Sequence, residues 1–119
     1  MNFTPMSPMK DVMSEVEDPR RIRIGASVIC RRTGVVKAPG NVDKLRRKEL
    51  DLVSYLYENS ARVVTRDELL SKVWHCSMVV TRTVDQTIAT LRRKLGDDYR
   101  SPRHLITVHG LGYMLRQAA

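Results

Sequence analysis

Cysteines are scarce in this sequence, and a long apolar run is missing altogether. The two cysteines, Cys30 and Cys76, do not have the paired spacing of a disulfide framework or a zinc site. No segment reaches the roughly 20 consecutive apolar residues that span a bilayer. The N-terminus also lacks the basic front and apolar core of a secretory signal. We therefore expect a cytoplasmic protein with two free thiols and no membrane span.

The common motifs of enzymes are missing as well. No nucleophile is paired with a base, and no glycine-rich loop is spaced to bind a phosphate. His75 and Cys76 are adjacent, but His104 and His109 lie in a distant segment, so no metal-binding spacing links them. We therefore predict no catalytic residues, no metal site and no cofactor.

Positive charge is what the sequence has in excess, and it is unevenly placed. The 119 residues carry a formal net charge of +8. Residues 1–18 hold one lysine against four acidic residues and sum to −3. Residues 19–119 hold 20 lysines and arginines against nine acidic residues and sum to +11. A small domain this basic favours a polyanionic partner, and nucleic acid more than a membrane surface.

Residues 1–18 are predicted to be a flexible acidic tail that contains methionine and proline. Ser7-Pro8 suits the start of a helix. Apolar residues follow at helical spacing, at Met9, Val12, Met13 and Val16. Such a helix is too short to be stable alone. The alternative is a segment that docks on this domain or on a partner.

Residues 20–45 have the pattern of short strands. Ile22 and Ile24 alternate with arginines, and Val28 alternates with Cys30. Turn residues interrupt the run at 32–34 and at Pro39-Gly40. We predict an antiparallel meander of three or four strands.

Two helices are predicted between residues 46 and 74. The first has an apolar stripe and a C-terminal cap at Asn59, and its stripe consists of Leu50, Val53, Leu56 and Tyr57. The second starts at a capping box, in which the Thr65 hydroxyl and the Glu68 carboxylate each accept from a free backbone N–H. Val64 and Leu69 are placed as its hydrophobic staple. Residues 74–80 have no clear period and are predicted to be a loop.

A third helix is predicted at 82–95, because its apolar residues fall in one narrow sector at about 100° per residue. That sector consists of Val84, Ile88, Leu91 and Leu95. Gly96 suits the position after its C-cap. Residues 105–108 and 113–115 then flank His109-Gly110-Leu111-Gly112, which predicts a β-hairpin. The order of elements predicts an α+β winged helix-turn-helix domain over 19–119.

Four motifs in this order resemble the C-terminal effector domain of OmpR/PhoB-type bacterial response regulators: KELDLVSYL, RVVTRDELLSKVW, RTVDQTIATLRRKLG and LITVHGLGYML. RIRIGASVICRRTGVV is similar to the opening sheet of that family, so the resemblance covers about residues 20–116. It implies a cytoplasmic, DNA-binding transcription regulator of a two-component system. The helix at 82–95 would enter the major groove of double-stranded DNA, and the wing at 105–115 the adjacent minor groove. The resemblance also implies binding as a pair of copies and contact of RNA polymerase with loop 74–80.

The resemblance assigns roles to individual residues. Base contacts fall at Thr83, Gln86, Thr87 and Thr90, where Gln can pair with adenine and Thr can meet a thymine methyl. Contacts to the DNA backbone fall at Arg66, Trp74, Arg82, Arg92, Thr107 and Tyr113. Arg93 is a further candidate because it is basic and predicted to be exposed. Each has a structural alternative: helix surface for the threonines, solvated charge for the arginines, core for Trp74, and a cross-strand pair for Thr107 with Tyr113.

Three features depart from the family pattern. Relatives often carry arginine where Thr90 and His109 stand, and an arginine–guanine contact gives about 1–3 kcal/mol of discrimination. The absence of this contact predicts a more A·T-rich site or weaker discrimination between bases. His109 is the wing's minor-groove candidate, and we expect binding to tighten as pH falls through the histidine range. Arg46-Arg47-Lys48 crowds cations at a helix start, where they serve an extra phosphate contact, a contact to a second copy, or no function.

The family usually carries a receiver domain ahead of this one, for which 119 residues leave no room. The Met1 start and the acidic tail favour a stand-alone regulator over an excised effector domain. The alternative function is a protein-interaction module on the same fold, with DNA binding lost or weakened. Salt-dependent binding to duplex DNA distinguishes the two.

Overall fold

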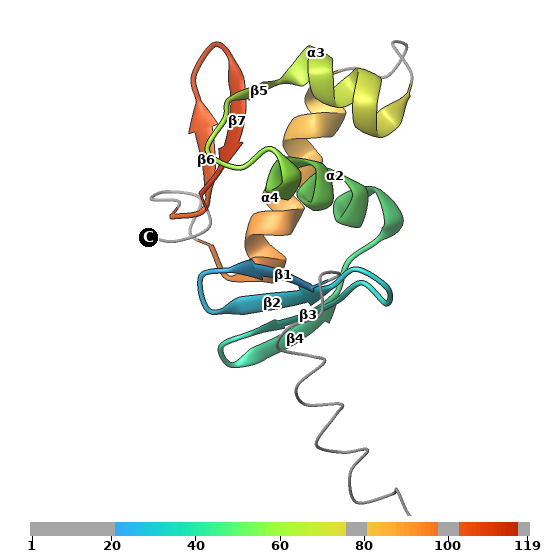
Figure 1. Ribbon diagram of the computed structural model, residues 1–119, viewed down its shortest axis with the longest axis vertical. Coiled ribbons are helices and arrows are strands. Elements are labelled where there is room, and N and C mark those ends of the chain that lie inside the picture. The colour runs from blue at the N-terminus through green and yellow to red at the C-terminus, as the bar shows by residue number, and fades with distance from the viewer. Residues whose placement is uncertain (1–20, 76–80, 98–102, 117–119) are drawn as a thin grey trace, which may run out of the picture.

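The computed structural model describes residues 21–75, 81–97 and 103–116, and within them it has the predicted α+β layout (Figure 1). The predicted tail at 1–18 and loop residues 76–80 lie outside the described residues. In chain order the elements are β1 (Arg21–Ile24), β2 (Ser27–Cys30), β3 (Val35–Ala38), β4 (Asn41–Lys44), α2 (Arg47–Glu58), β5 (Val64–Thr65), α3 (Arg66–Leu69), η1 (Leu70–Trp74), α4 (Thr81–Leu95), β6 (Leu105–Val108) and β7 (Gly112–Leu115).

The N-terminal sheet is a four-stranded antiparallel meander in the order β1-β2-β3-β4. Ile22 pairs with Ile29, and Ile24 pairs with Ser27. Residues directly opposite each other share a face, so Ser27 and Ile29 join the buried isoleucines of β1. The predicted alternation in β2 therefore has the wrong phase: Val28 and Cys30 lie on the outer face, because the β1–β2 register and not the local composition sets which face is buried.

Helix α2 confirms the predicted stripe in part, because Val53 and Leu56 are buried as predicted and Leu52 is buried with them. Leu52, Val53 and Leu56 are fully buried, whereas Leu50 and Tyr57 are only partly buried against the core. At its N-terminus the Glu49 carboxylate accepts from the Arg46 backbone N–H at 2.8 Å. This is half of a capping box, since an arginine side chain has no acceptor for the return bond.

The predicted cap of the second helix is also half confirmed. The Thr65 hydroxyl accepts from the Glu68 N–H at 3.0 Å, and the staple residues Val64 and Leu69 are both fully buried. The Glu68 carboxylate, however, bonds to the side chains of Tyr55 and Arg62 in other segments and does not complete the capping box. The helix continues as η1 to Trp74, one residue into the predicted loop.

Helix α4 buries the predicted apolar sector together with Lys94. Its end is a Schellman motif, in which the Gly96 N–H donates to Arg93 O at 3.3 Å and the Asp97 N–H to Arg92 O at 2.8 Å. Gly96 has φ +75°, the left-handed conformation that this motif needs. The predicted C-terminal glycine is thus confirmed.

The C-terminal hairpin belongs to a three-stranded sheet in the order β5-β7-β6. The sequence analysis did not predict β5, which pairs Val64 with Tyr113 and Thr65 with Gly112. A Cβ on Gly112 would lie 2.1 Å from the Val64 carbonyl oxygen, so only glycine lets the two backbones approach. The hairpin is thereby fixed to the start of α3.

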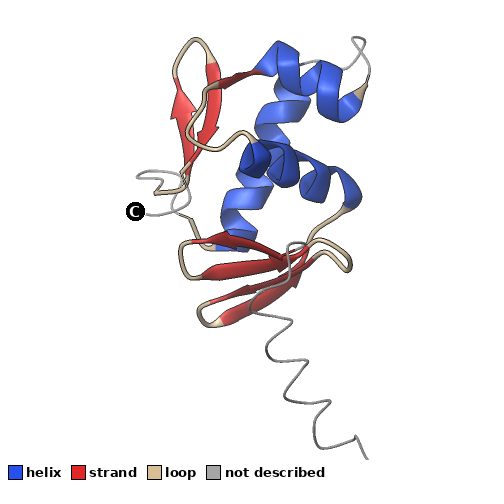
Figure 2. Ribbon diagram, viewed as in Figure 1, coloured by secondary structure: helices blue, strands red, loops and turns tan. Residues whose placement is uncertain are grey.

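Figures 1 and 2 show the helices on one side of the four-stranded sheet, with the β6–β7 hairpin beside α4. One cluster of buried side chains joins the inner sheet face to α2, α3, α4 and the hairpin. In the described part of the chain, no helix is long and apolar enough to cross a bilayer.

Candidate nucleic-acid interface

The solvent face of α4 is formed by four residues at helical spacing. Arg82, Gln86, Ala89 and Arg93 are all exposed, and they lie opposite the buried sector of Val84 and its partners. A neutral amide therefore stands between two arginines on one line along the helix. Arginines bind phosphates, and a glutamine amide both donates and accepts at a base edge.

The three threonines predicted for base contact lie on the flank of this face and are partly buried. The Thr87 hydroxyl donates to Thr83 O at 2.8 Å, and the Thr90 hydroxyl donates to Gln86 O at 3.1 Å. Both hydroxyl protons are thus used within the helix. What Thr87 and Thr90 offer a ligand is therefore an acceptor lone pair and a methyl group.

Arg92 connects α4 to the hairpin. Its Nε and Nη2 donate to Leu105 O at 3.0 and 2.6 Å, and Nη2 also donates to the Thr107 hydroxyl at 2.8 Å. Arg92 and Thr107 were each predicted to contact the DNA backbone, and the fold brings them together. Within the described residues the Nη1 group of Arg92 has no hydrogen-bond partner, so it is the part of the guanidinium left for a phosphate.

Arg66 and Tyr113 meet at a single carboxylate on α4. Asp85 Oδ1 accepts from Arg66 Nε at 2.8 Å and from the Tyr113 hydroxyl at 2.5 Å. The Arg66 guanidinium also lies over the Tyr113 ring, 5.2 Å from its centroid. The hydrogen bond to Asp85 raises the pKa of Arg66, and burial followed by the Asp85 bond raises the pKa of Tyr113. The predicted phosphate contacts of both residues would compete with Asp85.

Lys94 follows Arg92 and Arg93 in the basic run at the end of α4, but its environment differs from theirs. Its Nζ donates to Glu49 at 2.8 Å and to Lys44 O at 2.9 Å, and both side chains of the ion pair are buried. The helical period places Lys94 on the inner flank of α4, facing the start of α2. It joins two helices and is not available to a phosphate.

Two of the three cations at the start of α2, Arg47 and Lys48, have partners within the domain. Arg47 pairs with Asp51 at 3.4 Å, and Lys48 Nζ donates to Val73 O at 3.0 Å. Lys48 therefore ties α2 to η1, a structural role that the sequence pattern did not indicate.

Trp74 and His109 differ in exposure. Trp74 ends η1 and packs partly buried against the core, which agrees with the core role given as its structural alternative. His75 follows with φ +53°, a left-handed position that turns the chain out of the helix. His109 stands exposed at the hairpin turn, beside Leu111, whose side chain is 56% exposed. The hairpin tip thus presents one imidazole and one apolar side chain.

Asp97 fixes the base of the hairpin, and the sequence analysis missed it. Its carboxylate accepts from the backbone N–H groups of Arg103, His104 and Leu105 at 2.9, 3.1 and 3.0 Å. Because Asp97 directly follows the Schellman end of α4, it ties the start of β6 to that helix. An aspartate after a helix-ending glycine is the only sequence signal for this role.

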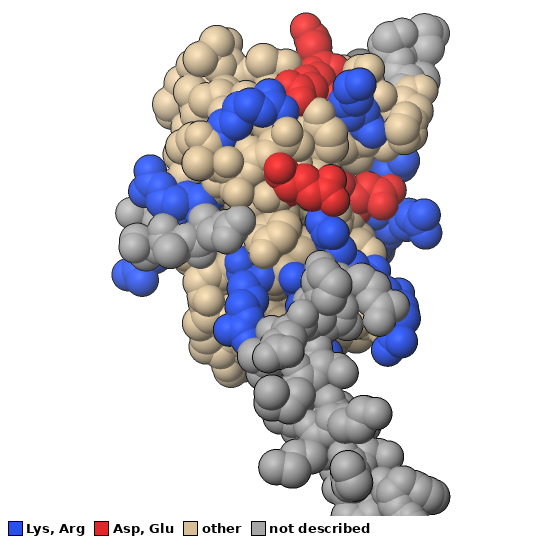
Figure 3. Space-filling model, in the orientation of Figure 1, with Lys and Arg blue, Asp and Glu red and all other residues tan. Residues whose placement is uncertain are grey.

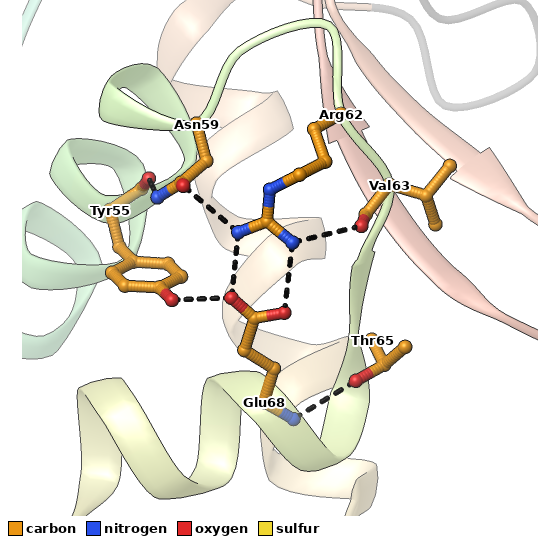
Figure 4. Close-up of polar contacts among 6 residues, drawn as sticks. All are labelled: Tyr55, Asn59, Arg62, Val63, Thr65 and Glu68. Atoms are coloured by element: carbon orange, nitrogen blue, oxygen red, sulfur yellow. Dashed lines mark hydrogen bonds and ion pairs between the residues drawn. The ribbon is translucent and has the colours of Figure 1, made fainter.

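A second cluster missed by the sequence analysis lies at the start of α3 (Figure 4). Glu68 accepts from Arg62 at 2.7 and 3.1 Å and from the Tyr55 hydroxyl, and Arg62 also donates to Asn59 at 2.9 Å. The Arg62 and Tyr55 hydrogen bonds lower the pKa of Glu68 to about 2. The same carboxylate raises the pKa of Tyr55. The cluster locks the α2–β5 connection.

Among the described residues, no group of His, Cys, Asp and Glu is arranged to hold a metal ion. The described polar network is instead built from charged pairs between elements. It holds α4, β5 and the hairpin as one unit, with the line of Arg82, Gln86 and Arg93 facing outward.

Sequence comparison matches residues 40–115 to the family described as "Transcriptional regulatory protein, C terminal". The sensory transduction protein RegX3 of Mycolicibacterium smegmatis is 45% identical over 82 residues, which are 68% of this chain and 36% of that protein. The chain thus spans about a third of the length of the curated relatives it matches.

Solved structures give the same fold. The DNA-binding domain of Escherichia coli CadC superposes with a TM-score of 0.71 at 31% identity, over 82% of this chain and 92% of that one. The Klebsiella pneumoniae RstA DNA-binding domain, solved in complex with the RstA box, gives a TM-score of 0.70 at 26% identity, over 82% and 98%. Both superpositions extend over more residues than the matched family segment.

Proposed function

Because this chain belongs to the family of transcriptional regulatory protein C-terminal domains, which OmpR/PhoB-type response regulators share, we propose that the outer face of α4 and the tip of its hairpin bind the two grooves of double-stranded DNA. Sequence-specific binding of double-stranded DNA by a transcription regulator is the function that the family and its structural neighbours support. In the proposal, α4 enters the major groove and β6–β7 the adjacent minor groove.

The exposed line of Arg82, Gln86 and Arg93 on α4 is the observation that supports assigning DNA contacts to individual side chains. The two arginines bind phosphates on either side of the groove, and Gln86 reads a base edge between them. Thr83, Thr87 and Thr90 add methyl contacts, which suits thymine. The Nη1 of Arg92 and the His109 side chain extend the contact to the hairpin side.

The wider setting is also proposed. The chain acts in the cytoplasm as a non-enzymatic regulator within a two-component system, and it binds DNA as a pair of copies. Residues 74–80 contact RNA polymerase. We assign residues 19–119 to the DNA-binding domain and residues 1–18 to a separate segment.

A protein-interaction module is the second candidate, and one observation favours it. Arg66 and Arg92, both predicted to bind phosphate, are already hydrogen-bonded inside the domain. If those contacts cannot be exchanged for phosphate, fewer cations remain for DNA. The slope of binding against salt distinguishes the two candidates, because each phosphate contact contributes about 0.9 to the logarithmic slope.

Selection of bound duplexes from a random pool at moderate salt tests the proposal. We expect a recovered motif with two half-sites, and loss of the base preference at one position of each half-site in a Gln86→Ala variant with its fold retained. A matched control is Ala89→Ser on the same face, which should recover the native motif. If no motif is recovered and the salt slope is flat, the chain is the interaction module instead.

A further inference from the structure

The four-stranded sheet has an outer face that no described helix covers (Figure 1). One row of directly paired residues crosses all four strands on this face: Arg23 opposite Val28, Val28 opposite Lys37, and Lys37 opposite Val42. A second row holds Val35 opposite Lys44. We call these six residues the outer sheet face.

The charged residues of the outer sheet face are all cations. The cations Arg23 and Lys37 alternate with valines along the row, and both are exposed. Within the described residues neither side chain has an ion-pair partner. The only acidic residue in the four strands, Asp43, pairs with the buried Val36 and so lies on the opposite face.

Apolar surface accompanies this charge. Val42 is 68% exposed and lies on β4, an edge strand of the sheet. An exposed apolar side chain at a sheet edge favours contact with another segment. An open depression on the same face is lined by Arg23, Val28, Lys37, Ala38 and Pro39, among others. On the side seen in Figure 3, basic side chains lie over the part of the molecule that holds the four-stranded sheet.

The complement to this face is present in the same chain. Residues 1–18 carry Asp11, Glu15, Glu17 and Asp18 against one lysine. Apolar side chains stand between these acids at Val12, Met13 and Val16, and Met9 precedes the first of them. The segment leads into β1 at Arg21, so its tether to the sheet is short and its effective concentration at the sheet is high.

We propose that residues 1–18 dock on the outer sheet face, with their carboxylates on Arg23, Lys37 and Lys44 and their methionines and valines against Val28 and Val42. The docked segment covers the exposed valine of β4 and offsets positive charge on the side of the sheet remote from the hairpin. This docking is independent of DNA binding by α4.

Paramagnetic relaxation measured on the full chain tests the docking. A nitroxide is attached at Ser7→Cys, outside the proposed contact residues, in a Cys30→Ser, Cys76→Ser background, and amide intensities are compared with those of the reduced label. At low salt we expect loss of intensity at Val28, Lys37 and Val42 but not at Gly110 on the hairpin. High salt should restore the lost intensity, since screening weakens the ion pairs.

Two variants identify the contact. Arg23→Glu with Lys37→Glu should abolish the intensity loss, whereas Arg82→Glu with Arg93→Glu, an equal charge change on α4, should preserve it. Because charge reversal on the sheet could disturb folding, Glu15→Gln with Glu17→Gln and Asp18→Asn provides a second test that leaves the folded residues unchanged. It should also abolish the effect.

Three results would overturn the proposal. The first is an unchanged intensity at Val28, Lys37 and Val42 in the labelled native chain. The second is equal loss at Gly110, or equal sensitivity to the α4 variant, either of which indicates unspecific collapse. The third is intensity loss in an isotope-labelled chain mixed with a spin-labelled one, which assigns the face to a second copy.

Discussion

The Nε of Arg66 lies 2.8 Å from Oδ1 of Asp85, which joins the first residue of α3 to the first third of α4. Tyr113 of the hairpin donates to the same oxygen. One carboxylate therefore orders three elements of the proposed interface and holds an arginine that phosphate would otherwise attract. Because of this bond, a DNA phosphate must compete with Asp85 for the Arg66 guanidinium.

Asp85→Asn should strengthen non-specific DNA binding, because it releases Arg66 and removes a negative charge next to the phosphates. We expect the logarithmic salt slope to steepen by about 0.9, the value for one additional phosphate contact. Fluorescence anisotropy on a random duplex across a salt series measures it. Asp67→Asn is the matched control, since Asp67 is exposed on α3. Equal steepening in both variants would show that net charge alone is responsible.

Lys94→Ala should destabilise the fold by about 3–5 kcal/mol, because it leaves the Glu49 carboxylate buried without its partner. Urea denaturation measures the loss. The double change Glu49→Leu with Lys94→Met should recover part of it, since an apolar pair of similar volume replaces the buried ions while the bond from the Arg46 N–H to Glu49 is lost. A small loss in the single variant would mean that Glu49 is solvated in its absence.

Arg93→Gln should reduce the salt slope of DNA binding by about 0.9 without changing stability, because Arg93 is exposed at the end of α4. The adjacent variant Lys94→Ala should give the opposite pattern, a loss of stability in place of a change in salt slope, because Lys94 pairs with Glu49. Parallel anisotropy and denaturation series on the two variants separate binding from folding. A loss of stability in Arg93→Gln would show that the Arg93 side chain contributes to the packing of the domain.

Gln86→Ala should lower discrimination between the preferred site and a single-base variant by about 1–3 kcal/mol, with little effect on binding to a random duplex. The reason is that a base contact carries sequence information and a phosphate contact does not. Competition binding with the selected motif and its single-base variants gives this difference. A uniform loss across all duplexes would instead assign Gln86 to the DNA backbone.

Acid should weaken the fold through Glu68. Its pKa is lowered from 4.5 to about 2, so the folded state favours the ionised form. The stabilisation is therefore complete above about pH 4.5 and is lost as pH falls toward 2. The stability gap between the native chain and Glu68→Gln should close over that range in urea titrations. A gap that stays constant with pH would exclude ionisation of Glu68 as its source.

Periodicity was sufficient to predict α4, because its buried sector, its glycine end and its exposed arginines are all local features. The partners of its charged residues were not predictable in this way. Lys94 bonds to Glu49, which is 45 positions away in the sequence, and Arg92 bonds to Leu105, which is 13 positions away. Such pairs depend on how the helices pack. Residues that are adjacent in sequence, Arg93 and Lys94, thus have opposite environments.

Very short elements were the other source of error. Strand β5 has two residues, too few to show an alternating pattern. The one sequence feature connected with it is Gly112 on the opposite strand, which has no side chain to block the pairing. The phase of β2 depended on the register with β1. The roles of the predicted base-contacting residues remain predictions that the selection experiment addresses.

The anchoring of the hairpin has a mechanical consequence. Asp97 holds its base to the end of α4, Arg92 holds its first strand, and β5 holds its second. The separation between the helix and the hairpin tip is then a fixed length. If both enter DNA grooves, any mismatch in groove width must be taken up by bending the DNA rather than the protein. Sites with easily deformed base steps would then bind more tightly than stiff sites with identical contacts.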